Sequence, residues 1–104
     1  MEHNKLVRDK IPDIIRTTGE EALTRILPDD EYKTLLERKL DEEVCEYHES
    51  RELEELADIL EVVYALCEVH GNSIEELTSV YQKKHKARGG FAEKVFLIST
   101  TVKG

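Results

Sequence analysis

Four acidic residues in the middle of the chain form two pairs with the same spacing. Glu43 and Glu46 are three residues apart, and so are Glu55 and Asp58. Residues three apart on an α-helix lie on the same side of it, so each pair would present two carboxylates together. Four carboxylates form a hard oxygen site, which suits Mg²⁺ or Mn²⁺ better than zinc. The spacing therefore predicts a magnesium site at these four residues.

The helical positions of three of these residues strengthen the prediction. Glu43 lies on the apolar side of its predicted helix, between Leu40 and Tyr47 on the helical wheel. A carboxylate on an inward side costs free energy unless it is paired or binds a metal. Glu55 and Asp58 likewise continue an apolar side of the following helix. Without a cation, charges this close would repel one another. The alternative interpretation is an ordinary solvated acidic surface, which the wheel geometry alone does not exclude.

Two long helices must position these carboxylates. We expect the first over about 29–49 and the second over about 51–70, with Ser50 as the cap of the second and Gly71 at its end. Because only a few residues join them, the helices should form an antiparallel hairpin. Counted from the turn near Ser50, the first acidic pair lies four and seven residues before it, and the second pair five and eight residues after it. The two pairs would therefore reach similar heights and converge on one ion.

The remaining predicted elements are a third long helix and several short segments. Ser73 and Glu76 form a capping box for the third long helix, which would reach about residue 87 and pack on the hairpin. A short helix should run from Pro12 to about residue 18, ended by Gly19. Short extended segments are expected at His3–Val7, Ala22–Leu27 and Val95–Thr100. The predicted fold is therefore mainly α, a helical hairpin plus a third long helix with short N- and C-terminal β-strands, in a single domain over residues 1–104.

The net charge of −8 is concentrated in one quarter of the chain. Between residues 37 and 61 there are 11 acidic and three basic side chains, and outside this stretch the two signs balance. A protein that binds nucleic acid would show a basic face instead. No apolar run approaches the roughly 20 residues of a membrane span, and the charged start lacks the apolar segment of a secretory signal. Cys45 and Cys67 form no CxxC pair. These features predict a cytoplasmic protein with reduced thiols that binds neither nucleic acid nor membranes.

The ordered set of acidic residues resembles the signature of a known enzyme family. Glu43-x-x-Glu46 followed by Glu55-x-x-Asp58, within KLDEEVCEY and EELADILEVVYAL, is similar to the metal-bearing helices of the all-α nucleoside triphosphate pyrophosphohydrolases, the MazG-like superfamily. The opening NKLVRDKIPDII and the late KKHKARGGF resemble its phosphoribosyl-ATP pyrophosphohydrolase-like subgroup. The resemblance extends over nearly the whole chain, from about residue 4 to residue 97.

This resemblance implies hydrolysis of a nucleoside triphosphate to the monophosphate and pyrophosphate. The four acidic residues would be both metal ligands and catalytic residues, with Mg²⁺ bridging the phosphates of the substrate. A water oriented by the metal, or by one carboxylate acting as base, would attack between the α- and β-phosphoryl groups. The substrate would be an ordinary or a modified nucleotide, the latter in a house-cleaning role. The chain has no clear markers for histidine biosynthesis, so the name of the subgroup does not fix the substrate.

Binding of the outer phosphates needs basic side chains as well. Lys84 and Arg88, four residues apart near the end of the third long helix, are the first candidates. Further candidates lie in the N-terminal segment and beside the acidic residues of the first long helix: Lys5, Arg8, Lys10 and Lys39. The alternative for each is an ordinary surface base.

Members of the family are dimers or tetramers whose neighbouring subunits complete the pocket, which implies a homodimer or homotetramer here. The second long helix supports this implication because it has two apolar sides, one with Leu53, Leu56 and Leu60 and the other with Ile59 and Val62. Three alternative functions stay open. They are hydrolysis of phosphoribosyl-ATP, a helical oligomer that binds a nucleotide or partner protein without catalysis, and a purely structural module on which Mg²⁺ has no effect.

Overall fold

The computed structural model describes residues 1–103, and this part of the chain contains four helices. They are α1 (Ile11–Thr17), α2 (Asp29–Ser50), α3 (Leu53–Val69) and α4 (Ile74–Arg88). The chain divides into two compact units, one comprising Met1–Asn72 and a second beginning at Ser73. The mainly α fold class is confirmed, whereas the single domain over the whole chain stays a prediction.

The first three helices begin and end close to their predicted positions. In α1, Pro12 occupies the first turn, where its missing N–H costs nothing, and Gly19 follows the helix with a φ of 88°. In α2, the first turn holds Asp29, Asp30 and Glu31, whose charges favour the positive end of the helix dipole. These local signals lie within one turn of each helix end, which is why the sequence shows them directly.

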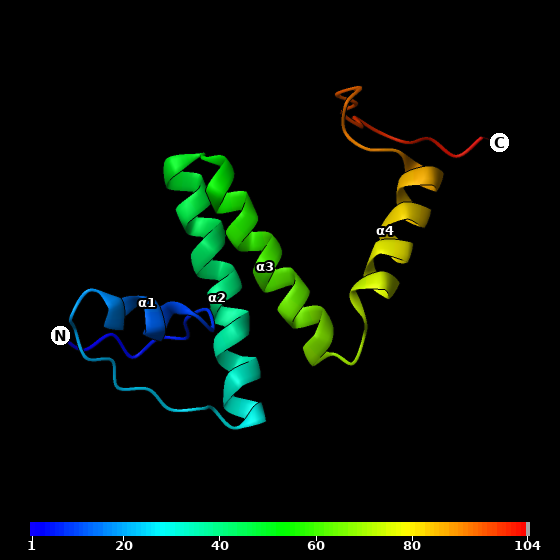
Figure 1. Cartoon of the computed structure of the whole chain (residues 1–104). Helices are drawn as coiled ribbons and strands as arrows, with labels where there is room; N and C mark the ends of the chain where they lie inside the picture. Colours follow the sequence, from blue (N-terminus) through cyan, green and yellow to red (C-terminus); the bar gives the residue numbers. More distant parts are fainter. Residues whose placement is uncertain (104) are drawn as a thin grey trace. The chain divides into compact units, whose positions relative to one another are not determined.

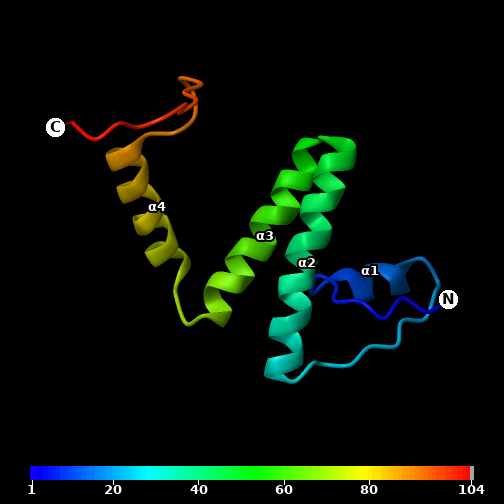
Figure 2. The ribbon, with the colours of Figure 1, turned by 180° about the vertical axis from the view of Figure 1, so that it is seen from behind.

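The helices α2 and α3 lie side by side as an antiparallel hairpin (Figures 1 and 2). The chain reverses at Arg51, which has a left-handed backbone conformation with φ 60° and ψ 23°. Its backbone N–H donates to the carbonyl of Tyr47 at 2.8 Å, and its Nε donates to the carbonyl of His48 at 2.9 Å. The guanidinium also lies 5.7 Å from the centre of the Tyr47 ring, within range of a cation–π contact. Arg51 thus satisfies carbonyls that the end of α2 leaves free.

The prediction that Ser50 caps the second long helix is wrong. Ser50 is the last residue of α2, and the residue at the start of α3 is Glu52, whose side chain makes no capping hydrogen bond. The Ser50 hydroxyl instead accepts a hydrogen bond from the backbone N–H of Glu52 at 3.3 Å. The physical reason is the left-handed residue between them, which moves the start of α3 beyond the reach of an ordinary serine cap.

The hairpin has a thin apolar core. Among the described residues only Leu36, Val62 and Glu43 are buried, with 4%, 7% and 7% of their surface exposed. Val62 belongs to one of the two predicted apolar sides of α3. On the other side, Leu53, Leu56 and Leu60 remain exposed to 80%, 46% and 47%. Only one of the two sides is therefore covered within this unit.

The helix α4 begins with the predicted capping box. The hydroxyl of Ser73 accepts a hydrogen bond from the backbone N–H of Glu76 at 3.1 Å, and the Glu76 carboxylate accepts one from the Ser73 N–H at 3.1 Å. Gly89, with a φ of 79°, follows the last residue of α4. The packing of this helix on the hairpin stays a prediction.

The predicted β-strands are not present in the part of the chain that the structure describes. His3–Val7, Ala22–Leu27 and Val95–Thr100 are all irregular. A strand requires a neighbouring strand to accept and donate its backbone hydrogen bonds, and none of these segments has one among residues 1–103. Phe96 and Ile98 are accordingly 87% and 89% exposed. None of the described helices combines the length and the apolar character needed to cross a membrane.

Candidate metal centre

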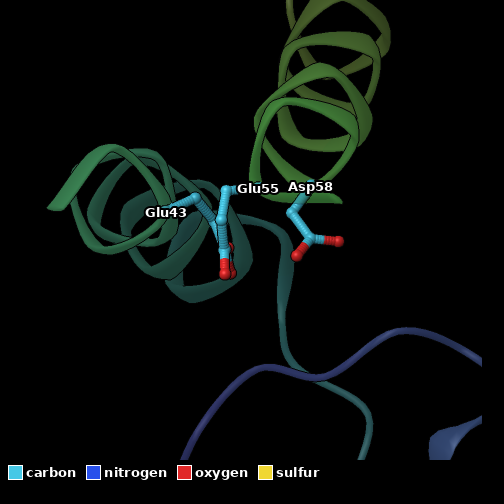
Figure 3. A group of neighbouring side chains, drawn as sticks. All are labelled: Glu43, Glu55 and Asp58. Atoms are coloured by element: carbon cyan, nitrogen blue, oxygen red, sulfur yellow. The ribbon is translucent and has the colours of Figure 1, made fainter. Parts of the chain in front are cut away.

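The helical hairpin brings together three of the four predicted acidic residues. Glu43 comes from α2, whereas Glu55 and Asp58 come from the first two turns of α3. One carboxylate oxygen from each lies within 4.8 Å of the others. Figure 3 shows the Glu43 and Glu55 carboxylates directed toward the same space, with Asp58 beside them. The i, i+3 spacing and the short turn together account for this convergence.

Two of these carboxylates carry a buried oxygen that the protein leaves unsatisfied. The Oε2 atoms of Glu43 and Glu55 are inaccessible to solvent and have no hydrogen-bond partner among residues 1–103. Glu43 is one of the three buried residues of the hairpin, while Glu55 and Asp58 are half-buried. A buried acceptor without a partner costs about 1–3 kcal/mol, and more when it is charged. The arrangement is therefore unfavourable for the ionised protein alone.

Burial and charge repulsion raise the pKa of both glutamates. Burial is the largest cause for Glu43, followed by the charge of Glu46, while Lys39 opposes the shift. Burial is again the largest cause for Glu55, where the charges of Glu46 and Asp58 add to it. A bound cation would reverse the repulsion that raises each pKa.

Two basic side chains partly balance the acidic cluster. Nη2 of Arg8 lies 2.6 Å from Oδ1 of Asp58 and donates a hydrogen bond to it. Nζ of Lys39 lies 3.6 Å from Oε1 of Glu43 and 3.6 Å from Oε2 of Glu42, both on α2. Each base leaves the Oε2 atoms of Glu43 and Glu55 without a partner. The cluster therefore retains unsatisfied acceptors even with both bases in place.

The other predicted site residues lie outside this group of three. Glu46 is exposed, although its charge acts on Glu43 and Glu55, and its role as a ligand stays a prediction. Lys5 and Lys10 are exposed residues of the N-terminal segment. Lys84 and Arg88 are exposed residues of α4 in the second compact unit, so their part in phosphate binding also stays a prediction.

The contact of Arg8 with Asp58 is the feature of the site that sequence reasoning missed. The sequence marks Arg8 as a base for phosphate, but the two residues are separated by 50 positions. No periodicity or local motif relates residues so far apart, because their proximity depends on how the N-terminal segment returns to α3. The signal that the sequence offers is charge: the segment is basic, with lysines on either side of Arg8, and would be attracted to the acidic hairpin.

The residues present fit a divalent cation. In an octahedral Mg²⁺ site with Mg–O distances of about 2.0–2.1 Å, neighbouring oxygens lie about 3 Å apart and opposite oxygens about 4 Å apart. The oxygens of Glu43, Glu55 and Asp58 lie within 4.8 Å of one another, so they would move closer together to bind one ion. The donors are all carboxylate oxygens, the type that Mg²⁺ and Mn²⁺ prefer. The two unsatisfied Oε2 atoms are the acceptors that such an ion would satisfy.

Comparisons with known proteins leave the function open. No family model matches the sequence, and no solved structure matches it. An uncharacterized protein of Mycolicibacterium smegmatis is 55% identical to the chain over 42 residues. The match covers 40% of this chain and 43% of that protein, so the chain spans less than half of the relative's length. This similarity assigns neither a family nor an activity.

Proposed function

We propose that this chain is a magnesium-dependent nucleotide pyrophosphohydrolase. The observation that carries the proposal is the buried Glu43. Its Oε2 has no hydrogen-bond partner among the described residues, and one of its carboxylate oxygens lies within 4.8 Å of oxygens of Glu55 and Asp58. A small hairpin gains no stability from this arrangement, since repulsion and desolvation both oppose it. Retention of an unfavourable group in the core is typical of a functional site. The family resemblance of the acidic motifs supports the same reaction.

In the proposed site the acidic residues would bind the metal and the basic residues would bind phosphate. Glu43, Glu55 and Asp58 would hold Mg²⁺, with Glu46 beside them, and Mn²⁺ would substitute. The ion would neutralise phosphate charge and make water more acidic. One of the carboxylates beside the ion would act as the general base that takes a proton from the attacking water. Arg8 and Lys39 would pair with phosphate oxygens, and their contacts with Asp58 and Glu43 keep both beside the proposed ion.

The proposal includes a homo-oligomer, either a dimer or a tetramer. The exposed side of α3, with Leu53, Leu56 and Leu60, is apolar, and the hairpin beneath it has few buried residues. An apolar helix side of this kind is usually covered by another element or another subunit.

The test is hydrolysis of a panel of ordinary and modified nucleoside triphosphates, together with phosphoribosyl-ATP, with and without Mg²⁺. We expect Mg²⁺-dependent release of pyrophosphate and monophosphate. Glu55→Gln should lower kcat/KM by about 100-fold or more, the size of effect seen when one electrostatic stabiliser is removed. Glu54→Gln is the matched control, because it removes the neighbouring exposed carboxylate of α3 and should have little effect. Glu46→Gln tests the fourth acidic residue.

The other outcomes separate the alternative functions. Turnover of phosphoribosyl-ATP alone would assign that substrate. Stabilisation by Mg²⁺ without turnover of any compound would replace catalysis with a binding role. No effect of Mg²⁺ on either activity or thermal stability would leave only a structural helical module.

A further inference from the structure

Arg8 joins the N-terminal segment to the candidate metal centre. Its guanidinium donates a 2.6 Å hydrogen bond to Oδ1 of Asp58, and it is the base that approaches the cluster from outside the hairpin. In Figure 3 the blue N-terminal segment passes on the side toward which the carboxylates point. The cluster thus already holds a positive charge from the N-terminal segment, in addition to that of Lys39 on α2.

We propose that Arg8 occupies Asp58 in the metal-free protein, leaves it when a divalent ion binds, and then pairs with the phosphates of the substrate. This inference rests on the proposed metal centre and adds to it a competition between the ion and a side chain of the same protein. Arg8 would therefore oppose metal binding and favour phosphate binding.

The competition follows from the position of the two positive charges. An ion held by Glu43, Glu55 and Asp58 would share the Asp58 carboxylate with the guanidinium of Arg8. Like charges on one carboxylate repel, and each reduces the acceptor strength available to the other. By thermodynamic linkage, if the ion weakens the contact between Arg8 and Asp58, that contact must weaken the binding of the ion by the same factor.

Arg8 is also free enough to move. Its side chain is 54% exposed, and that of Asp58 is 39% exposed, so solvent screens the pair and its loss costs little. The adjacent residues Leu6 and Val7 are half-buried and would keep the segment attached while the side chain rotates. Lys39, in contrast, is fixed on α2 four residues from Glu43 and is 25% exposed, so it lacks this freedom.

The released guanidinium is chemically matched to a polyphosphate. Its planar set of N–H donors pairs with two oxygens of one phosphate. A phosphate bound to the ion would lie next to Asp58, the residue that Arg8 contacts in the metal-free protein. Lys5 and Lys10, in the same segment, add charge without a fixed partner on the hairpin among residues 1–103.

The test uses titration calorimetry to measure Mn²⁺ binding by the wild-type protein and by the variants Arg8→Gln and Lys10→Gln. Lys10→Gln is the matched control, because it removes the same charge from the same segment without removing the contact to Asp58. Arg8→Gln should bind Mn²⁺ about two- to fivefold more tightly, the range expected from loss of a half-exposed ion pair. Lys10→Gln should change the affinity by less than about twofold.

A second titration, with inorganic tripolyphosphate at saturating Mn²⁺, should show the opposite sign. Arg8→Gln should bind tripolyphosphate at least about threefold more weakly than wild type, because it lacks the charged donor. The tripolyphosphate affinity of Arg8→Lys should lie between those of the wild type and Arg8→Gln. Arg8→Lys also serves as the second variant if Arg8→Gln does not fold. Equal effects of Arg8→Gln and Lys10→Gln on Mn²⁺, or loss of affinity for both ligands in Arg8→Gln, would overturn the inference.

The same data separate this inference from the proposed function. Suppose that wild type binds Mn²⁺, Glu55→Gln does not, and Arg8→Gln binds it as tightly as wild type. This result would overturn the competition and leave the metal centre in place. Absence of Mn²⁺ binding by wild type, or equal binding by Glu55→Gln, would reject the metal centre and the competition together.

Discussion

At the scale of single residues, Glu43 combines burial with a negative charge. Its side chain occupies a core that contains only two other buried residues in the described part of the chain, Leu36 and Val62. Lys39 at 3.6 Å offsets part of the charge, but burial and the neighbouring Glu46 outweigh it and raise the pKa of Glu43. The residue therefore weakens the metal-free fold at neutral pH, and this cost can be measured.

Replacement of Glu43 by glutamine should stabilise the metal-free protein. Glutamine keeps the size of the side chain but removes the charge that burial and Glu46 oppose. We expect the free energy of unfolding at pH 7 in EDTA to rise by roughly 1 kcal/mol, the usual scale for one substitution. Urea unfolding measures it, with Glu37→Gln as the control because this carboxylate of α2 is exposed. Stabilisation by Mg²⁺ should be lost in the same variant, and destabilisation in EDTA would contradict this account.

The raised pKa values also predict how stability varies with pH. Glu43 and Glu55 have higher pKa values in the folded protein than the ordinary value of about 4.3. As the pH falls from 7 toward 5, the folded state binds protons before the unfolded state does, so stability rises. Glu31 acts in the opposite direction, because Arg25 lowers its pKa, but its contribution is lost only below the ordinary value.

Urea unfolding in EDTA at pH 7, 6 and 5 tests this dependence. The free energy of unfolding should increase over this range in wild type and change less in Glu43→Gln. A decrease of equal size in both proteins would show that these two carboxylates do not dominate. With saturating Mg²⁺ the slope should reverse, since protonation competes with the ion for the same oxygens.

At the scale of the helices, the site depends on how firmly α2 and α3 are held together. Leu36 on α2 and Val62 on α3 are the apolar residues that are buried in the described structure, so they carry much of the contact. The carboxylates lie on the same two helices. Loss of the apolar contact should therefore separate the ligands.

Leu36→Ala should destabilise the hairpin by about 2–4 kcal/mol, through lost burial and the cavity that remains. Leu23→Ala makes the same chemical change at a residue that is fully exposed and should cost less than about 0.5 kcal/mol. Thermal unfolding by circular dichroism measures both. Equal effects would show that the contact between α2 and α3 is not the main source of stability. Mn²⁺ affinity should fall only in Leu36→Ala.

At the scale of the whole molecule, the exposed side of α3 predicts self-association. Leu60 is 47% exposed and Leu56 is 46% exposed, on the same helix as two of the candidate ligands. Leu60→Glu should raise the dissociation constant of the oligomer by about tenfold or more, because burying a leucine contributes roughly 1.5–3 kcal/mol. Leu23→Glu is the control, as an equally apolar residue outside α3. Sedimentation at several concentrations measures both, and a monomeric wild type at high concentration would reject the interface.

The sequence by itself determined the helices and the side on which the acidic residues lie. The signals at the helix ends act within one turn, so a short stretch of sequence is enough to recognise them. They are the proline and the acids at helix starts, the Ser73–Glu76 capping box and the glycines at helix ends. The i, i+3 spacing of the acids and the short connection between the two long helices are equally local. These features predicted the hairpin and a cluster of four acids, Glu43, Glu46, Glu55 and Asp58. The structure brings oxygens of Glu43, Glu55 and Asp58 within 4.8 Å of one another.

Only the tertiary structure decided the features that depend on distant partners. The apolar segment Val95–Thr100 has a strand-like composition, but no strand lies beside it among residues 1–103. The choice between the two apolar sides of α3 was made by packing against α2, which covers Val62 and leaves Leu60 exposed. Likewise, Arg8 reaches Asp58 because the chain path returns to α3, across a separation of 50 residues that no local pattern encodes. Contacts of this kind arise from the balance of burial and charge over the folded chain, and sequence spacing alone does not contain that balance.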